Sequence, residues 1–529
     1  MSTLKKKPSD NRTFSDGLNP YVILAIALGV AIVVGYFLYP RHIVALADLV
    51  WDRPLDGAGA GELVGTDINN DGVVDLLAGT GRAWADPPTG ALVAMDGQTG
   101  DTLWRSVFPG AIDGTPLLLD ITGDGDPEVI VSGHFADLYA LNRRTGDILW
   151  QLSHQPSNVI HLPCQFHSPV MVPDQDNDGV PDIATIQSGL LENNPYIQIK
   201  RLDLLKSNPV YYHRADIESL IQTMMATTRH PVLQWQVCQG GNCRVQSFPR
   251  AWVDNGVFES YFPRLMGNQV GPGGRLYVIS SRTGRIIRWF PVPESRESRG
   301  APVVVSYGGR TVVIYGSGGI RKNGFLQAQD VVSGEILWQQ SFNKKGVLLS
   351  PIQWGDGDDR WVVAAGMNGE VLKVNALTGQ MAWRVSLGDD YETLATPAII
   401  YRHNRPHVAV LFSRGEFPQY QSSVLFVLDG AMGEVVFRQK MGDCYATASP
   451  LIVDVDGDRR DDILQVTCTD RRAKIMILDH DYQSIFSHPL SSGSVSSPLI
   501  LDIDQDGHQD LFISRFHYIT RFRFRESFP

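Results

Sequence analysis

Short apolar runs alternate with polar turns along most of this chain, and this pattern predicts β-strands rather than helices. A typical unit begins with a small residue and a proline before an apolar run, as at Thr115-Pro116. Neighbouring prolines of this kind are mostly 46 to 53 residues apart. That spacing is suited to the four-stranded blades of a β-propeller.

The second half of each unit is a strand, a tight turn and a strand that carries a large aromatic residue. The clearest copy covers residues 94–104, with Thr99-Gly100 in the turn and Trp104 on the second strand. Glycine in the turn supplies a positive φ, and the aromatic ring can pack against the next unit. Close variants cover residues 140–150, 328–338 and 374–383.

The number of units predicts the number of blades. Eight acidic or vestigial hairpins can be counted, but the aromatic strand follows only seven of them. The first strand supplies the missing one, because residues 48–51 (Asp-Leu-Val-Trp) resemble residues 147–150 (Asp-Ile-Leu-Trp). Such closure joins the two ends of the chain in one blade and removes an exposed sheet edge. We therefore predict an all-β fold, an eight-bladed β-propeller over residues 48–529, with seven blades as the alternative.

One unit is much longer than the others, since Pro169 and Pro302 are 133 residues apart. The excess predicts an insertion within that blade over residues 189–272, with a helix near residues 215–225. A long insertion on a rigid scaffold is a common place for binding specificity. We expect it either to contact a partner or to cap the propeller.

Five hairpins spell nearly the same nine-residue acidic loop. Loops 1 to 5 cover residues 67–75, 120–128, 174–182, 454–462 and 502–510. Oxygen-bearing side chains recur at positions 1, 3, 5 and 9, and four of the five loops have Gly at position 6. The predicted metal ligands are Asp67, Asn69, Asp71 and Asp75; Asp120, Thr122, Asp124 and Glu128; Asp174, Asp176, Asp178 and Asp182; Asp454, Asp456, Asp458 and Asp462; and Asp502, Asp504, Asp506 and Asp510.

This arrangement is how a hard cation such as calcium is surrounded, and the glycine permits the sharp turn. The loops lack the Glu at position 12 of an EF-hand, so position 9 supplies the late carboxylate instead. Loop 4 fits less well, because Arg459 replaces the glycine and Arg460 adds a second positive charge. The alternative is a polar turn that is held by its own hydrogen bonds without metal. Calcium is the cofactor that the sequence predicts, and its role would be structural.

The net charge agrees with metal sites and disagrees with a nucleic-acid partner. The formal charge is -11 at pH 7, whereas nucleic-acid binding requires a basic surface. Much of the acidity lies in the five loops. We interpret it as a signature of the metal sites rather than as a surface for basic partners.

The N-terminal part predicts a membrane anchor. Residues 21–39 carry no charge and are rich in Ile, Val, Leu and Ala. A helix of that length rises ~28 Å, enough to cross the hydrocarbon core of a bilayer. Lys5, Lys6, Lys7 and Arg12 precede it, so the positive-inside rule places the tail 1–20 in the cytoplasm. The expected protein is single-pass type II with a signal anchor and an extracytoplasmic propeller (periplasmic, or extracellular or lumenal); a cleaved signal peptide is the alternative.

An extracytoplasmic location permits disulfides. Cys238 and Cys243 end a short turn-like segment whose ends could meet, and Cys444 and Cys468 flank one hairpin. These two pairs are the possible disulfides, and Cys164 is then left over.

The repeats resemble two known modules. The acidic hairpins resemble the FG-GAP repeats of integrin alpha-subunit propellers. The Ala-x-Asp-x-x-Thr-Gly-x-x-x-Trp strands resemble the tryptophan-docking repeats of pyrroloquinoline-quinone dehydrogenases and related propellers. Together with the anchor, they make the chain similar to the integrin-alpha FG-GAP-repeat-containing membrane proteins, the family with sequence similarity 234. That resemblance implies a membrane-tethered propeller of no established catalytic activity.

The function that the sequence favours is binding. We expect a non-catalytic, adhesion- or scaffold-like module that binds another protein or a surface ligand. A quinone-dependent dehydrogenase-like enzyme is one alternative, but many of those enzymes have an adjacent Cys-Cys pair, which this sequence lacks. An envelope assembly factor is the other alternative.

Overall fold

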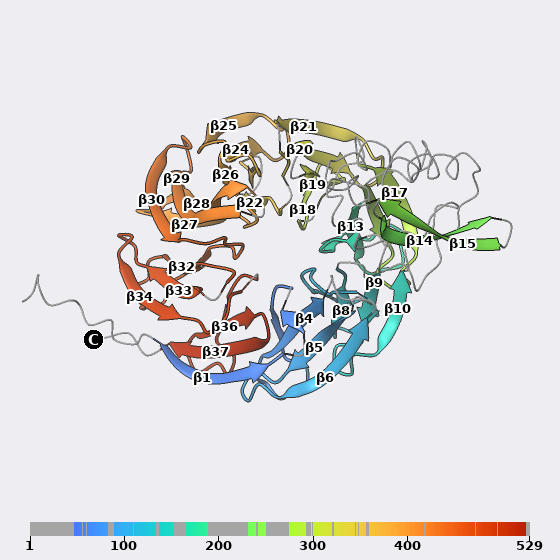
Figure 1. The fold of residues 1–529 in the computed structure, drawn as a ribbon, viewed down its shortest axis with the longest axis horizontal. Coiled ribbons are helices and arrows are strands. Elements are labelled where there is room, and N and C mark those ends of the chain that lie inside the picture. The colour runs from blue at the N-terminus through green and yellow to red at the C-terminus, as the bar shows by residue number, and fades with distance from the viewer. Residues whose placement is uncertain are drawn as a thin grey trace, which may run out of the picture. The chain divides into compact units, whose positions relative to one another are not determined.

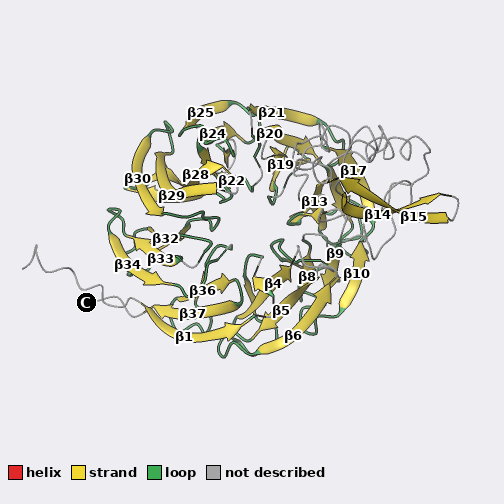
Figure 2. Cartoon of the chain, in the orientation of Figure 1, coloured by secondary structure: helices red, strands yellow, loops and turns green. Residues whose placement is uncertain are grey.

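The alternating apolar runs form antiparallel sheets that are the eight blades of a β-propeller (Figure 1). The predicted all-β, eight-bladed architecture is confirmed, and eight rather than seven is the number of blades. Strands joined by turns and loops account for all the elements in the described ranges, as Figure 2 shows.

The computed structural model describes a single compact unit that begins at Ala47. It describes residues 47–524 except for 56, 60, 83–88, 109, 134–136, 153–164, 189–230, 240–241, 250–273, 293–297, 299, 320–321, 344, 348, 356–358, 417–418, 471 and 495. The predicted tail, the predicted anchor at 21–39, most of the insertion and its predicted helix lie outside these ranges. Among the described residues, no helix has the length and apolar character needed to cross a membrane.

Blades 1 to 4 follow one another along the chain, each from an inner strand outward (Figure 1). Their strands are β2 (Ala58–Gly59), β3 (Val64–Thr66), β4 (Asp75–Arg82), β5 (Thr89–Met95) and β6 (Thr102–Phe108); β7 (Leu117–Leu119), β8 (Glu128–Val131), β9 (Leu138–Leu141) and β10 (Ile148–Leu152); β11 (Gln165–Phe166), β12 (Val170–Val172), β13 (Asp182–Ser188), β16 (Arg275–Ile279) and β17 (Ile286–Pro291); and β18 (Val303–Tyr307), β19 (Arg310–Gly319), β20 (Lys322–Asp330) and β21 (Ile336–Phe342).

Blades 5 to 8 complete the ring. Their strands are β22 (Ile352–Trp354), β23 (Trp361–Ala365), β24 (Glu370–Asn375) and β25 (Met381–Ser386); β26 (Tyr391–Glu392), β27 (Ala398–Arg402), β28 (Arg405–Glu416), β29 (Gln419–Asp429) and β30 (Val435–Gly442); β31 (Leu451–Val453), β32 (Asp462–Val466), β33 (Lys474–Leu478) and β34 (Ser484–Pro489); and β35 (Leu499–Leu501), β36 (Asp510–Arg515), β37 (Tyr518–Phe524) and β1 (Ala47–Pro54).

Blade 8 combines the two ends of the described chain. Strand β1 lies at the outer edge of that blade and pairs antiparallel with β37, with Trp51 opposite Arg521. The predicted closure is therefore confirmed. Arg515 on β36 and Thr520 on β37 both donate hydrogen bonds to the carboxylate of Asp52, which ties the two termini together by polar contacts as well.

The hydrophobic core lies between neighbouring blades. One cluster combines Leu77 and Leu92 of blade 1 with Val129 and Tyr139 of blade 2, and all four side chains are almost fully buried. Because both faces of each sheet are covered in this way, the inner strands are nearly continuous apolar runs rather than alternating ones. The ring is thus one continuous body in which each blade depends on its neighbours.

In five of the eight described blades, the aromatic strand acts as predicted and docks its blade onto the next. The indole N–H of Trp104 donates to the backbone oxygen of Arg143 in the following blade, at 2.9 Å. Four more tryptophans make the same kind of bond to the next blade, at 2.8 to 3.3 Å: Trp51, Trp150, Trp338 and Trp383. Blade 3 departs from the pattern, since Trp289 is 45% exposed and the ring of Phe290 lies against Gly334 instead.

Substituting Gly146 by Ala should destabilise this docking contact by roughly 2–3 kcal/mol. Gly146 has a φ of 74°, and an added Cβ would lie 2.5 Å from the Trp104 ring. Gly309→Ala is the matched control, because its φ of 77° imposes similar backbone strain but its Cβ would meet no atom within 4 Å. Urea unfolding of the two variants should separate the steric part from the backbone part, and equal losses would contradict a docking role.

Hydrogen bonds next to the first strands join neighbouring blades at five junctions of the described propeller, and in four of them the acceptor is the serine that precedes a blade's proline. The backbone N–H of Thr115 donates to the hydroxyl of Ser168 in the next blade, at 3.1 Å. Equivalent bonds run from Ala301 to Ser350, Thr396 to Ser449 and Ser449 to Ser497. At the junction of blades 8 and 1, Glu62 replaces the hydroxyl and accepts from both the N–H and the hydroxyl of Ser497. Burial raises the pKa of this carboxyl.

The order of the strands places two kinds of turn at one end of each of blades 1 to 7. In an antiparallel meander, the loop between the first and second strands and the loop between the third and fourth strands lie at the same end. The acidic loops are of the first kind and the Thr-Gly turns of the second. In blade 3, β11 and β12 both pair with β13 and together form an interrupted first strand. The insertion leaves between β13 and β16, the second and third strands on this count, and therefore starts from the opposite end.

Cysteines occur at two places in the described chain. A disulfide joins Cys444, which follows β30 of blade 6, to Cys468, which follows β32 of blade 7, with 5.6 Å between the Cα atoms. Cys238 on β14 (Pro231–Gln239) lies opposite Cys243 on β15 (Asn242–Pro249) in the backbone pairing of the insertion's hairpin. The possible bond between those two side chains lies outside what the structure describes, as does Cys164.

Candidate metal centres

The five acidic loops join the first and second strands of blades 1, 2, 3, 7 and 8, and they share one internal geometry. In each, the carboxylate at position 1 accepts the backbone N–H of position 6 at 2.8 to 3.0 Å, as Asp174 does from Gly179. The carboxylate at position 5 accepts the N–H of position 7 at 2.8 to 3.0 Å, as Asp178 does from Val180. These bonds pre-order the oxygens for a cation, and they are also the bonds of a metal-free polar turn.

The carboxylate at position 9 has a different environment, because it begins the second strand and is buried. Asp75, Asp182 and Asp510 are fully buried, and Glu128 and Asp462 are nearly so. In loops 1 to 4 this carboxylate accepts the N–H of position 2, at 2.6 to 3.0 Å. It therefore fixes the start of the loop to the base of the blade.

The two ends of the loop differ in acidity. The N–H of Gly179 lowers the pKa of Asp174 at position 1. Burial and then nearby carboxylates act in the opposite direction at position 9, where the pKa of Asp182 rises to about 6 and that of Asp462 to about 7. Burial also raises the pKa of Asp75 and of Glu128. A buried carboxylate without a counter-charge is unfavourable, and a bound cation would relieve it.

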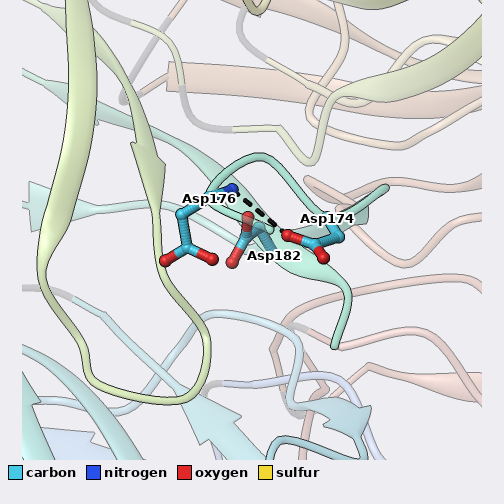
Figure 3. A group of neighbouring side chains, drawn as sticks. All are labelled: Asp174, Asp176 and Asp182. Atoms are coloured by element: carbon cyan, nitrogen blue, oxygen red, sulfur yellow. Dashed lines mark hydrogen bonds between the residues drawn. The ribbon is translucent and has the colours of Figure 1, made fainter. Parts of the chain in front are cut away.

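In loop 3 the carboxylates converge on one point, as Figure 3 shows for Asp174, Asp176 and Asp182. One oxygen from each lies within 4.8 Å of the others, and loop 4 brings Asp454, Asp456 and Asp462 together in the same way. Three such oxygens fit a hard cation that prefers carboxylate ligands. The residues present in these loops therefore fit calcium.

Loops 1 and 2 carry a neutral residue at position 3. The amide oxygen of Asn69 accepts the N–H of Asp71 at 2.9 Å, while its amide nitrogen donates to the Asp71 carboxylate. The hydroxyl of Thr122 lies 3.4 Å from the Asp120 carboxylate. Both side chains offer an oxygen to a cation, but each of these loops has one negative charge fewer than loop 3 at the four predicted ligand positions.

In loop 5 the group within 4.8 Å consists of Asp502, Asp504 and Asp506, and Asp510 is not part of it. Asp510 instead pairs through both oxygens with Arg521, at 2.8 and 3.0 Å. The structure therefore brings three of the four sequence-predicted ligands together in each of loops 3, 4 and 5, and position 9 of loop 5 has a different partner.

Position 6 is constrained by the backbone rather than by space. The glycines there have φ values of 87 to 90°, and nothing lies within 4 Å of an added Cβ. Loop 4 forces Arg459 into the same left-handed region, with a φ of 63°. A side chain in that region is strained.

Replacing Arg459 by Gly should stabilise the protein by roughly 0.5–1 kcal/mol, because relief of the left-handed strain exceeds the entropy cost of glycine. Urea unfolding with and without calcium would measure it. The adjacent Arg460→Gly is the control, since Arg460 has no positive φ and pairs with Asp458 at 2.7 Å. That variant should lose stability, and a gain in both variants would attribute the effect to charge rather than to backbone strain.

Arginines near the loops were missed by the sequence reasoning. Arg143 and Arg144 both pair with Asp126 of loop 2, and Arg282 lies 3.4 Å from Asp178 of loop 3. Arg143 and Arg144 lie in the turn between the third and fourth strands of blade 2, and Arg282 lies in the corresponding turn of blade 3. Each arginine thus contacts the acidic loop of its own blade. The signal was present in the sequence as basic residues in those turns, and it becomes readable only once both turns are placed at one end of the blade.

Two blades without an acidic loop bury a cationic side chain near these turns. In blade 5, the ammonium of Lys373 lies 4.5 and 4.4 Å from the ring centres of Trp354 and Trp361 and donates to the backbone oxygen of Gly430. Burial lowers the pKa of Lys373. In blade 6, Arg402 lies over the Tyr482 ring, at 4.9 Å. A positive charge at this end of the blade is thus a recurring feature of the described propeller.

Comparison with known proteins agrees with the resemblance that the repeats suggest. Residues 85–197 match the FAM234A/B beta-propeller family model, and residues 322–443 match the model for outer membrane protein assembly factor BamB. Protein FAM234B of Mus musculus is 32% identical over 155 residues, and that of Homo sapiens is 31% identical over 154. Each match covers 27% of this chain and 24% of the relative, so the chain matches about a quarter of the relatives' length. Over that part, the resemblance to the family with sequence similarity 234 is confirmed.

Solved structures with a similar fold are more distant in sequence. The quinohemoprotein alcohol dehydrogenase ADHIIG from Pseudomonas putida HK5 has a TM-score of 0.51 at 10% identity, covering 92% of this chain and 78% of that one. BamB from Moraxella catarrhalis has a TM-score of 0.49 at 11% identity, covering 92% of this chain and 100% of that one. At these identities the likeness to the dehydrogenase supports the propeller fold alone.

Proposed function

We propose that this chain is a membrane-anchored, calcium-stabilised β-propeller that binds a protein partner and is not catalytic. The observation that carries the proposal is the repeated geometry of the acidic loops: three carboxylates converge in loops 3 and 4, and burial raises the pKa of the one at position 9. The named relatives support a non-enzymatic module, because their names state no catalytic activity. Calcium would have a structural role here: it would neutralise the buried carboxylates and hold the turns.

The extracytoplasmic location that we propose for the propeller agrees with a requirement for calcium. Calcium sites of extracellular modules are weak and depend on a high calcium concentration, which an extracytoplasmic compartment supplies. The uncharged stretch 21–39 with its preceding lysines supports an anchor that leaves the propeller outside the cytoplasm. Protease added outside intact cells should then degrade the propeller, whereas a chain with a cytoplasmic propeller would resist it.

The insertion is the surface that we propose for the partner. It is the longest segment between two paired strands of a blade, and it starts from the end of the propeller opposite to the acidic loops. Its described hairpin, β14 and β15, pairs with no other described strand. The hairpin of the insertion is therefore an addition to blade 3 and not part of its sheet.

Deletion of residues 190–271 tests this assignment. Gln187 and Arg275 are directly paired across β13 and β16, so a short glycine-containing turn can close the shortened hairpin. We expect the deletion variant to keep the melting temperature of the propeller and to lose a partner that crosslinking retains on the unaltered chain. A partner that crosslinks equally to the deletion variant would place binding elsewhere on the propeller.

An envelope assembly factor is the second candidate, and the match of residues 322–443 to the BamB model favours it. The two candidates differ in the partner that crosslinking should recover, which would be an outer-membrane assembly component in this case. A quinone enzyme is separated from both by a melt with pyrroloquinoline quinone. We expect no change in melting temperature and no dye-linked dehydrogenase activity.

A further inference from the structure

Loop 5 already contains a positive charge. Arg523 on β37 donates to Asp504 at 2.8 Å, lies 3.2 Å from a carboxylate oxygen of Asp506 and donates to Asp510 at 3.3 and 3.4 Å. One guanidinium thus contacts three of the four predicted ligand positions.

The carboxylate at position 9 is also taken out of the site. Arg521, which is 2% exposed, binds both oxygens of the fully buried Asp510. Arg521 further donates to the backbone oxygens of Gly97 and Gln98 in blade 1. Asp510 is therefore held by the contact between blades 8 and 1 and does not join the other three carboxylates of its loop.

The closing blade explains why an arginine can occupy this place. In blade 1, Ala94 pairs with Trp104, and Asp96 two residues later accepts the N–H of Thr99 to cap the turn. In blade 8, Arg521 pairs with Trp51 in the same way, so Arg523 occupies the position of Asp96. β37 does not lead through a turn into the fourth strand of blade 8, because that strand is β1 from the other end of the chain. The position is free of its capping role, and its side chain reaches the acidic loop of its own blade.

We infer that the guanidinium of Arg523 takes the place of the metal in loop 5, so that the blade which closes the ring is held without calcium. This inference rests on the proposed calcium binding by the other loops. The charge that neutralises loop 5 then belongs to the C-terminal strand itself, so the closing contact stays intact when calcium is scarce.

Counting bound calcium tests the inference, by equilibrium dialysis of the detergent-solubilised 529-residue chain at saturating calcium. Arg523→Gln should bind one ion more than the unaltered chain, because the three carboxylates that lie together in loop 5 lose their competing cation. Arg310→Gln is the control, since Arg310 pairs only with exposed Glu335 in a blade without an acidic loop, and it should leave the count unchanged. The same count in Arg523→Gln as in the unaltered chain would overturn the inference.

A matched pair of aspartates gives a second test that leaves Arg523 in place, should Arg523→Gln fail to fold. Asp174 and Asp502 both occupy position 1 of their loops, where all five loops carry Asp. Asp174→Asn should remove one ion, and Asp502→Asn should remove none; loss of an ion in Asp502→Asn would show that loop 5 binds calcium. If the unaltered chain binds no calcium but Arg523→Gln binds one ion, the proposed function fails while the inference stands.

Discussion

Chelating calcium should lower the melting temperature of the 529-residue chain by roughly 10 °C. A site with a dissociation constant near ~10 µM contributes roughly 2.7 kcal/mol at 100-fold excess of ligand, so loops 1 to 4 together contribute roughly 10 kcal/mol. Unfolding entropy of ~2.1 cal/mol/K per residue amounts to ~1 kcal/mol/K for a propeller of this size, which converts the free energy into that shift. The reason is the buried carboxylate at position 9 of each loop, which loses its counter-charge.

The melt should be measured in ~1 mM calcium, in chelator and in chelator with excess magnesium. Magnesium should restore little, because it demands a smaller octahedral site and loses its water reluctantly. Asp174→Asn should reduce the calcium-dependent shift by about a quarter, since it removes the position 1 carboxylate that all the loops share and so disables one of four loops. Equal melting temperatures in calcium and in chelator would mean that the loops are polar turns held by their own hydrogen bonds.

The repeat made most of the fold predictable from the sequence. Its period gave the blades, and the likeness of residues 48–51 to residues 147–150 gave the closure, which the pairing of Trp51 with Arg521 confirms. Both inferences depend only on short-range patterns that recur along the chain. The docking role of Trp104 was predictable for the same reason, since its indole contacts the adjacent copy of the same unit.

The partners of the acidic loops were less predictable, because they lie on neighbouring strands and turns whose sequences differ from one blade to the next. Arg523 reaches loop 5 only because blade 8 lacks the turn that follows Asp96 in blade 1. In blade 5, Lys373 places a positive charge against two tryptophan rings, and no acidic motif in that blade predicts it. Glu62 takes the place that a serine has at the other junctions, and its partner Ser497 becomes apparent only when the first and last blades are placed side by side.

Substituting Asp462 by Asn should stabilise the calcium-free protein and destabilise the calcium-bound one. Asp462 is 1% exposed, and burial followed by its neighbours Asp456, Asp458 and Asp454 raises its pKa to about 7. An Asp in the unfolded chain has a pKa of ~3.9, so between these values the folded state binds more protons than the unfolded state. The free energy of unfolding therefore falls as pH rises from ~4 to ~7, and the whole loss is present above that range.

At ~1.4 kcal/mol per pKa unit, the ionised Asp462 costs the calcium-free protein roughly 4 kcal/mol at pH 8. Asparagine carries no charge and keeps an oxygen that can accept the N–H of Val455, so the variant should recover most of that loss. With calcium bound, the same change removes a charged ligand and lowers stability instead. Urea unfolding at pH 5 and pH 8, with calcium and with chelator, measures both the gain and the loss of stability.

Asp461→Asn is the matched control, because Asp461 occupies no ligand position and its carboxylate accepts the N–H of Tyr401 at 2.7 Å. A loss of stability in Asp462→Asn under all four conditions would show that this carboxylate serves the turn and not a cation.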